Sequence, residues 1–340
     1  MINITDFNDQ YFYVFSDCFI TNGIKRLSIL DICRKKIHFL NADYFDLFEM
    51  MAKEKISKII SCLDTNKDVE YFSAFIQKMI NLELGMFVDD ISLFPPIEMR
   101  WESPSLITNA IIDIRHICHD FEMISNELNR CRCKHIEIRA YKILAIEEMQ
   151  FIISSFKEKS FTSVNLLMKY NEDKDYLKKI MSLTRNNTLF HLTLHGAPKE
   201  KVENNIMKMM HIIPEYISSC DFCGNISAKS FALLSIQSFM ENYLYNGCLN
   251  KKIAIDENGD IKNCPSMKRS FGNICNTSIF EIAQKKDFQT LWTVNKSQIK
   301  VCKDCEYRCI CTDCRAFIEN PDDIFSKPLK CSYNPYILKW

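Results

Sequence analysis

The N-terminal part of the chain alternates apolar and polar side chains over residues 10 to 40. A period of two is typical of strands that bury one face. The pair Asn22-Gly23 interrupts the alternation, and Asn-Gly is a strong signal for a tight hairpin turn. The pattern therefore predicts a β-hairpin followed by a third strand.

A helical period follows this small sheet. Asn41 is a good N-cap for a segment with apolar residues at helical spacing, residues 42 to 63. A second such segment covers residues 69 to 84 and is expected to end at Gly85. Residues 86 to 94 then predict a short wing. Strands, helices and a wing in this order are typical of a winged-helix-like α+β domain.

The middle of the chain alternates apolar strands with helical segments. Strands alternating with helices of about 10 to 15 residues indicate an α/β fold, in which helices cover a parallel sheet. The sheet is expected to be either doubly wound or a partial (β/α) barrel. Strands are predicted over residues 106–115, 135–141, 163–171 and 188–196, helices over 120–131, 145–159 and 173–187, and one more unit over 202–219.

The periodicity weakens from residue 220 onward, apart from one predicted helix over residues 227 to 246. A segment so rich in loops buries little apolar surface, so cross-linking by a metal would also help it to fold. The sequence therefore predicts three domains. They are a winged-helix-like domain over residues 1–92, the α/β domain over 100–219 and a loop-rich domain over 220–340.

Charge and composition argue against several classes of partner. Lys and Arg number 43, as do Asp and Glu, so the formal net charge is zero and no polyanion is favoured overall. Lys78 is the single Lys or Arg of residues 69 to 84, too few for a DNA recognition helix. There is no run of about 18 apolar residues and no export signal. We therefore expect a cytoplasmic protein that binds neither nucleic acid nor membrane.

Cysteines are concentrated in the last third of the chain, where eleven of the 17 lie from Cys220 onward. In a reducing compartment such thiols stay free unless a metal holds them. Cys302 with Cys305, and Cys311 with Cys314, form two C-x2-C pairs, a spacing that places two thiolates on one soft metal. Paired thiols of this kind build zinc sites as well as iron–sulfur sites.

Two further cysteines lie upstream, at the ends of a predicted hairpin. Cys248 and Cys264 flank a segment of alternating pattern whose turn is expected at Asn258-Gly259, so the hairpin would bring the two thiols together. This hairpin and the later thiols, in this order, resemble the SPASM domain, the auxiliary iron–sulfur module of radical-SAM peptide-modifying enzymes. The ordered thiols are Cys248, Cys264, Cys302, Cys305, Cys311, Cys314 and Cys331.

The resemblance implies two [4Fe–4S] clusters, with zinc as the alternative. Its pattern assigns Cys302, Cys305, Cys311 and Cys331 to one cluster, and Cys248, Cys264, Cys314 and Cys223 to the other. Cys220 and Cys275 compete with Cys223 for the last position. Only two residues separate Cys311 from Cys314, one fewer than is usual in the family, which leaves the partition between clusters open. Cys309 is an extra thiol, expected to be unligated.

The motif that binds S-adenosylmethionine in radical-SAM enzymes, C-x3-C-x2-C after the first barrel strand, does not occur in the sequence. The segment at that place holds Cys118 between His116 and His119. We therefore expect a degenerate radical-SAM-like partial barrel, and whether the protein is an enzyme stays open. Glu137 and Arg139 share one face of a predicted strand, which fits a buried ion pair or a substrate contact.

A degenerate barrel followed by a complete thiol set resembles the SPASM-domain peptide maturases of grasp-with-spasm systems. The segments 263–274, 301–317 and 319–336 carry this resemblance. It implies a role in the maturation of a ribosomally made peptide (RiPP), with a precursor peptide and an ATP-grasp ligase as partners. The first domain is then similar to a RiPP recognition element, which binds a leader peptide as an added strand. We expect the docking edge within Arg26–Cys33.

Two other functions remain open at this point. The protein could be a non-catalytic adaptor that presents the peptide to its ligase, with clusters that only stabilise the fold. It could also be a zinc-stabilised regulatory or binding protein.

Overall fold

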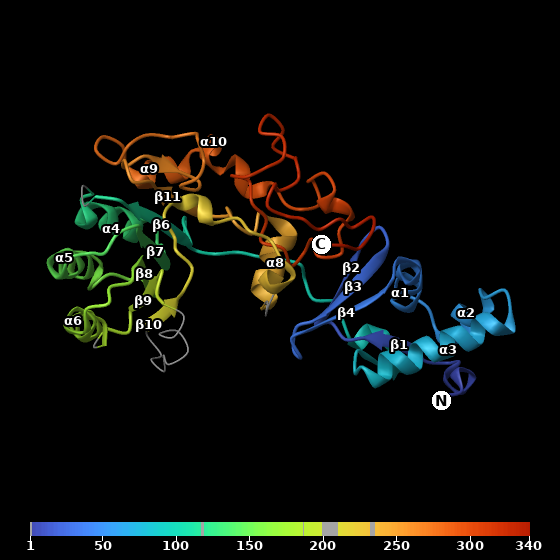
Figure 1. The fold of residues 1–340 in the computed structure, drawn as a ribbon. Helices are drawn as coiled ribbons and strands as arrows, with labels where there is room; N and C mark the ends of the chain where they lie inside the picture. Colours follow the sequence, from blue (N-terminus) through green and yellow to red (C-terminus); the bar gives the residue numbers. More distant parts are fainter. Residues whose placement is uncertain (1, 117–118, 186, 199–209, 232–234) are drawn as a thin grey trace.

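The computed structural model describes residues 2–116, 119–185, 187–198, 210–231 and 235–340. Figure 1 shows an N-terminal module at one end, an α/β sheet with its helices at the other, and the C-terminal segment reaching between them. Among the described helices, none is both long and apolar enough to cross a membrane.

The N-terminal module contains the predicted hairpin and third strand. Strands β2 (Cys18–Asn22), β3 (Arg26–Asp31) and β4 (Lys36–Asn41) form an antiparallel sheet in the order β2-β3-β4. Because β3 pairs with a strand on each side, the expectation that a peptide docks on residues 26–33 is wrong. The free edge that faces away from β3 belongs to β4.

A fourth strand of the alternating stretch lies outside this sheet. β1 (Tyr11–Val14) pairs instead with β5 (Gly85–Val88), where the wing was expected. Gly85 therefore begins a strand rather than ending a helix, and a Cβ there would lie 2.5 Å from the carbonyl oxygen of Tyr13. The close approach of β1 explains the glycine.

The first predicted helix is broken into shorter pieces, η2 (Ala42–Tyr44), α1 (Phe45–Met51) and α2 (Ile56–Ser61). Asn41 does cap, but it caps the 3₁₀ turn η2. The break has a physical cause, because the amides of Ile56 and Ser57 donate to carbonyls of the N-terminal segment instead of to a preceding helical turn. α3 (Asn66–Asn81) begins with a capping box of Thr65 and Asp68. Short 3₁₀ turns, η1 (Ile4–Phe7) and η3 (Ile91–Leu93), complete the module.

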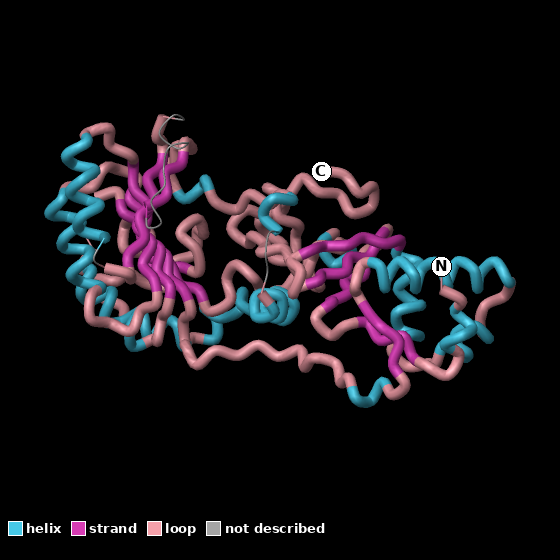
Figure 2. The backbone as a smooth tube through the Cα atoms, turned by 90° about the horizontal axis from the view of Figure 1, so that it is seen from below, coloured by secondary structure: helices cyan, strands magenta, loops and turns pink. Residues whose placement is uncertain are grey.

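The middle of the chain is α/β, as predicted. Five parallel strands lie in chain order across the sheet, and in Figures 1 and 2 the helices α4, α5 and α6 lie along one side of it. A doubly wound sheet carries helices on both faces, whereas the described helices α4 to α6 lie on one side of this sheet. The elements are β6 (Asn109–Ile114), α4 (Phe121–Arg130), β7 (His135–Ala140), α5 (Ile146–Phe156), β8 (Ser163–Lys169), α6 (Lys174–Arg185), β9 (Phe190–His195) and β10 (Met210–Ile213).

The hairpin predicted around Gly259 is present and joins this same sheet. β11 (Lys252–Ile255) lies parallel to β6, and β12 (Ile261–Lys262) lies antiparallel to β11. Gly259 has a φ of +85°, the conformation that favours glycine in such a turn. Residues of the hairpin share one hydrophobic core with β6 to β10. The sheet therefore continues past the expected boundary at residue 219, although the domain limits themselves stay a prediction.

The rest of the C-terminal third consists of loops and short helices, and its last part packs against the N-terminal module. Tyr307, Ile310 and Tyr333 share a core with Leu30 of β3 and Phe39 of β4. The three-stranded sheet is thus covered by α1 to α3 on one face and by the C-terminal segment on the other. The helices are η4 (Cys220–Phe222), η5 (Ala228–Phe231), α8 (Ile236–Leu244), α9 (Ile279–Gln284), α10 (Lys286–Gln289), η6 (Thr290–Thr293) and η7 (Cys302–Asp304).

Candidate metal centres

Four of the predicted ligands influence one another electrostatically, and we name them the Cys302 group: Cys302, Cys305, Cys311 and Cys331. Burial raises the pKa of Cys302 to about 11, and the thiols of Cys311 and Cys331 shift it further in the same direction. Burial also raises the pKa of Cys305, and the thiols of Cys302 and Cys311 raise it further. Without a metal the thiols of Cys302 and Cys305 are therefore protonated, and metal binding must displace their protons.

The backbone around Cys302 is folded for such a site. The 3₁₀ turn η7 begins at Cys302, and the amide of Cys305 donates to the carbonyl oxygen of Cys302 at 3.0 Å. Val301, just before the turn, has a φ of +67°. Cys331 enters from another segment and forms a β-bridge with Ile226. A local turn thus supplies two thiols, Cys311 follows shortly after it in the sequence, and a separate segment supplies Cys331.

A buried ionic network adjoins the Cys302 group. Lys296 Nζ lies 3.7 Å from Cys302 Sγ and 2.7 Å from Asp313 Oδ1. Arg315 holds the same carboxylate through two hydrogen bonds of 2.6 and 2.7 Å. These three residues are 4 to 5% exposed. Burial alone would lower the pKa of Lys296, but Cys311 and Asp313 raise it, so the ammonium stays charged.

This network tests whether the thiols suit an anionic metal group. Two buried cations and one buried carboxylate leave one positive charge without a partner inside the network. A buried charge is costly unless an opposite charge lies beside it. Thiolates around an iron–sulfur cluster would supply that negative charge next to Lys296. The donor set of the Cys302 group therefore fits such a cluster.

A second set, named the Cys248 group, consists of Cys223, Cys248, Cys264 and Cys314. Burial raises the pKa of Cys264 to about 12, with Cys248 and Cys223 adding to the shift. Cys248 acts in the same direction on Cys314, whose pKa is raised mainly by burial. At Gly224, with a φ of +87°, a Cβ would lie 3.0 Å from Cys314 Sγ. The glycine thus lets the backbone that follows Cys223 approach Cys314.

Lys252 relates to the Cys248 group as Lys296 does to the Cys302 group. Its Nζ lies 3.6 Å from Cys248 Sγ. Burial alone would lower the pKa of Lys252, but Cys248, Cys264 and Cys223 raise it above the usual value. Each set of thiols is therefore accompanied by one lysine ammonium. Cys223, the proposed fourth member, is among the thiols that act on this lysine.

The remaining cysteines of this region have other surroundings. After burial, the strongest influences on the pKa of Cys220 come from Ser266, Asp113, Asp221 and Arg139 rather than from thiols. Cys275 is exposed. Cys309 is buried, and its thiol is hydrogen-bonded to the side chain of Thr21 on β2. Its surroundings are those of a packed thiol, in line with the role expected for it.

Within the described part of the chain, no group of three or more His, Cys, Asp or Glu residues could hold a metal ion as it stands. All sixteen described cysteines are free thiols. The assignment of individual ligands therefore stays a prediction, carried by the electrostatic neighbourhoods and the two lysines.

The structure reveals a buried network that the sequence reasoning missed, at the carboxyl ends of β6 and β7. Arg139 donates two hydrogen bonds to Asp113, of 2.6 and 3.0 Å, and Tyr141 Oη donates a third at 2.7 Å. Glu137, the partner expected for Arg139, lies 3.9 Å away with a side chain 43% exposed. The partner is thus on the neighbouring strand. Asp113 and Arg139 are directly opposite in the parallel register, a signal available once the strands are paired.

The place of the missing C-x3-C-x2-C motif follows β6. Cys118 lies outside the described residues. His116 is exposed, whereas His119 is buried with its Nε2 3.0 Å from the carbonyl oxygen of Asp113. The two histidines therefore differ in environment, and His119 is part of the packing at the end of β6.

Comparison with known families identifies one segment. Residues 248–306 match the model of the SPASM family, described as an iron–sulfur cluster-binding domain. The match covers the β11–β12 hairpin and four of the proposed ligands, Cys248, Cys264, Cys302 and Cys305. No curated protein matches the chain. This part of the chain is thus similar to a domain that binds iron–sulfur clusters.

Proposed function

We propose that the protein is an iron–sulfur protein of ribosomal peptide maturation, which holds a precursor peptide and acts together with an ATP-grasp ligase. The observation that carries the proposal is the SPASM match at residues 248–306, together with two sets of thiols that each adjoin a lysine ammonium. SPASM domains accompany radical-SAM peptide-modifying enzymes, which is why a peptide is the proposed substrate.

We assign one [4Fe–4S] cluster to the Cys302 group and one to the Cys248 group. When bound, such clusters supply electron transfer or structural cross-linking. Each group offers four thiols, one for each iron, so neither cluster needs an open iron position. This favours a redox or structural role over direct binding of the peptide to iron. Lys296 and Lys252 balance the negative charge of the thiolates.

In this proposal the middle domain is a radical-SAM-like partial barrel without the radical-generating cluster. Its strands follow one another in order with the helices on one side, as in a segment of a barrel wall. Asp113 and Arg139 are hydrogen-bonded to each other at the carboxyl ends of β6 and β7, the edge at which βα barrels carry their active sites. The domain then serves as a scaffold onto which the β11–β12 hairpin packs.

The N-terminal module is the proposed leader-binding domain. Its three antiparallel strands are followed by α1, α2 and α3, and β4 is the strand whose outer edge is free for an added strand. At the opposite edge strand, β2, the carbonyl oxygen of Asn22 already accepts a hydrogen bond from Arg308 of the C-terminal segment. The outer edge of β4 is therefore the edge that we propose for the peptide.

Co-expression of the protein with a precursor peptide and its ATP-grasp ligase tests the proposal, with mass spectrometry of the peptide as the readout. We expect the peptide mass or the extent of ligation to change when the protein is present, and the change to be lost in Cys311→Ala. If the peptide is processed identically with and without the protein, the proposed role is wrong. A change that persists in Cys311→Ala would leave a peptide adaptor with dispensable clusters.

A further inference from the structure

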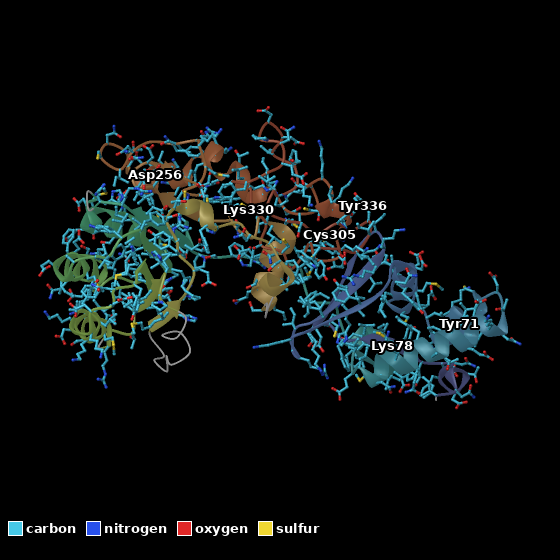
Figure 3. All side chains as sticks on the ribbon, viewed as in Figure 1. Tyr71, Lys78, Asp256, Cys305, Lys330 and Tyr336 are labelled. Atoms are coloured by element: carbon cyan, nitrogen blue, oxygen red, sulfur yellow. The ribbon has the colours of Figure 1, made fainter. Side chains whose placement is uncertain are left out.

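A groove of about 840 Å³ runs along the free edge of the N-terminal sheet. Its lining comes from several parts of the chain, among them Lys25 and Arg26 where β3 begins, Phe39 on β4, Tyr71 and Lys78 on α3, and Leu338 near the C-terminus. Figure 3 shows Tyr71 and Lys78 on α3. Tyr71 is 60% exposed and Leu338 is 38% exposed, so two large apolar side chains stand on the rim. These two side chains would contact an apolar part of any ligand in the groove.

The backbone at this edge has hydrogen-bonding groups to offer. The carbonyl oxygen of Arg26 accepts from Gly23 and so points toward β2, whereas that of Lys25 accepts from Ala42 and points toward β4. Neighbouring residues of a strand alternate in this way. In the register of β3 and β4, Leu27 lies opposite Leu40. Leu40 therefore bonds back to β3, and Phe39 and Asn41 direct their amide and carbonyl groups outward into the groove.

The charges of the groove are unbalanced. Lys25, Arg26 and Lys78 line it, against a single carboxylate, Asp43. Arg26 is ion-paired with Glu306 at 2.6 Å. Lys25 and Lys78 are exposed, and neither takes part in an ion pair found among the described residues. Two exposed ammonium groups that form no ion pair in the described part of the chain are complementary to a peptide with carboxylate side chains.

The groove differs from a simple sheet edge because the C-terminal segment forms one of its walls, through Leu338. Arg26 covers the ring of Phe39 at 4.0 Å and ion-pairs with Glu306, the residue after Cys305. Leu338 belongs to the same C-terminal segment. A peptide in the groove would therefore lie between α3 of the N-terminal module and the segment that follows the Cys302 group.

We infer that this groove takes an extended, apolar peptide segment with acidic side chains, added as a strand to β4, and that Lys25 and Lys78 select the acidic residues. The inference rests on the proposed function in so far as the segment belongs to the leader of the precursor peptide. The partner chemistry follows from the open edge, the apolar rim and the two unpaired ammonium groups. Neither the clusters nor the ligase enter this argument.

Fluorescence anisotropy with the anaerobically purified full-length protein tests the inference. The probes are labelled synthetic peptides of six residues, the length of β4. In each peptide valine alternates with glutamate, glutamine or lysine. The glutamate peptide should bind most tightly and weaken with added salt. Lys25→Gln and Lys78→Gln should each weaken it about two- to fivefold, and Lys78→Glu should weaken it further. Lys58→Gln, an exposed lysine on α2 outside the groove, is the matched control and should change nothing.

A second probe tests strand addition without altering the protein. The glutamate peptide with N-methylated amides keeps its side chains and loses its backbone donors, so it should lose binding. Equal affinity for the acidic and basic peptides, equal binding of the methylated peptide, or no binding of any probe would overturn the inference. The iron content of the same samples distinguishes a failure of this inference from a failure of the proposed function. A protein that contains clusters but binds acidic and basic peptides equally contradicts the inference alone.

Discussion

Arg26 Nε lies 2.6 Å from Glu306 Oε1, so the central strand of the N-terminal sheet is ion-paired to the residue that follows Cys305. The same carboxylate oxygen accepts from Tyr333 at 2.5 Å, and Ser28 donates to the carbonyl oxygen of Glu306 at 2.7 Å. Figure 3 places Cys305 beside this sheet. The loop that carries half of the Cys302 group is therefore fixed on β3.

Arg26→Met should destabilise the protein by about 3 kcal/mol, because the Glu306 side chain, 1% exposed, loses its cation and remains buried. We also expect iron to be lost faster from this variant under a chelator. The free energy of unfolding from urea denaturation and the time course of iron release measure the two effects.

The matched control for Arg26 is Arg100→Met. Arg100 and Glu102 form an ion pair with side chains 62% and 69% exposed, so its loss should cost less than about 1 kcal/mol and leave iron release unchanged. Equal effects of the two substitutions would show that the Arg26 pair does not hold the loop.

Lys296→Met should shift the reduction potential of one cluster to a more negative value. A buried positive charge beside the thiolates stabilises the reduced, more negative cluster, and its removal takes that stabilisation away. A redox titration followed by electron paramagnetic resonance measures the shift. Lys300→Met is the control, because that lysine is 72% exposed and pairs with Asp323. An unchanged potential in Lys296→Met would place the cluster elsewhere.

Cys311 and Cys309 are two residues apart, and both are buried, yet we expect opposite results from their removal. Cys311→Ala should lower the iron content by about half, since one of two clusters loses a ligand. Cys309→Ala should keep the iron and cost about 1 kcal/mol of stability through the lost packing beside Thr21. Iron analysis of both variants decides; loss of iron in Cys309→Ala would make that thiol a ligand.

The fourth ligand of the Cys248 group is tested by three single substitutions. Cys223→Ala should reduce the iron content, whereas Cys220→Ala and Cys275→Ala should leave it intact. The reason is that Cys223 acts on Lys252 together with Cys248 and Cys264, whereas neither Cys220 nor Cys275 is among the main influences on this lysine. If iron is lost only in Cys220→Ala or only in Cys275→Ala, that cysteine is the fourth ligand in place of Cys223.

Asp113→Asn should cost about 3 kcal/mol in the free energy of unfolding, because it leaves the guanidinium of Arg139 buried with a neutral partner. Arg139 is 6% exposed and holds Asp113 through two hydrogen bonds. Glu137→Gln, which touches the same arginine only at 3.9 Å, should cost less than about 1 kcal/mol. Similar costs in denaturant titrations would mean that Glu137 shares the charge.

Local signals in the sequence predicted much of the fold. Asn22-Gly23 and Gly259 mark their hairpins correctly, and the alternation of strands with helices gives the elements β6 to β9 near their predicted places. The errors arise where a distant segment intervenes. Gly85 suggests a helix end, but the approach of Tyr13 explains it better.

Pairing across the chain is what the sequence could not supply. The alternation suggests a docking edge within residues 26–33, but β3 is the central strand of its sheet. Strand order depends on contacts between strands, which the periodicity of a single strand does not record. Asp113 was missed for the same reason, because its partner Arg139 lies on a neighbouring strand. The thiol order did indicate a SPASM-like segment, and residues 248–306 match that family. Lys252 and Lys296 carried no motif, and only the folded arrangement brings them to the thiols.

The central claim is that the Cys302 and Cys248 groups hold two [4Fe–4S] clusters. Iron, acid-labile sulfide and zinc measured per chain in anaerobically purified protein test it most directly. The account predicts about eight iron atoms and about eight sulfides per chain, with broad visible absorption that bleaches on reduction. A colourless protein with stoichiometric zinc and no sulfide would contradict it.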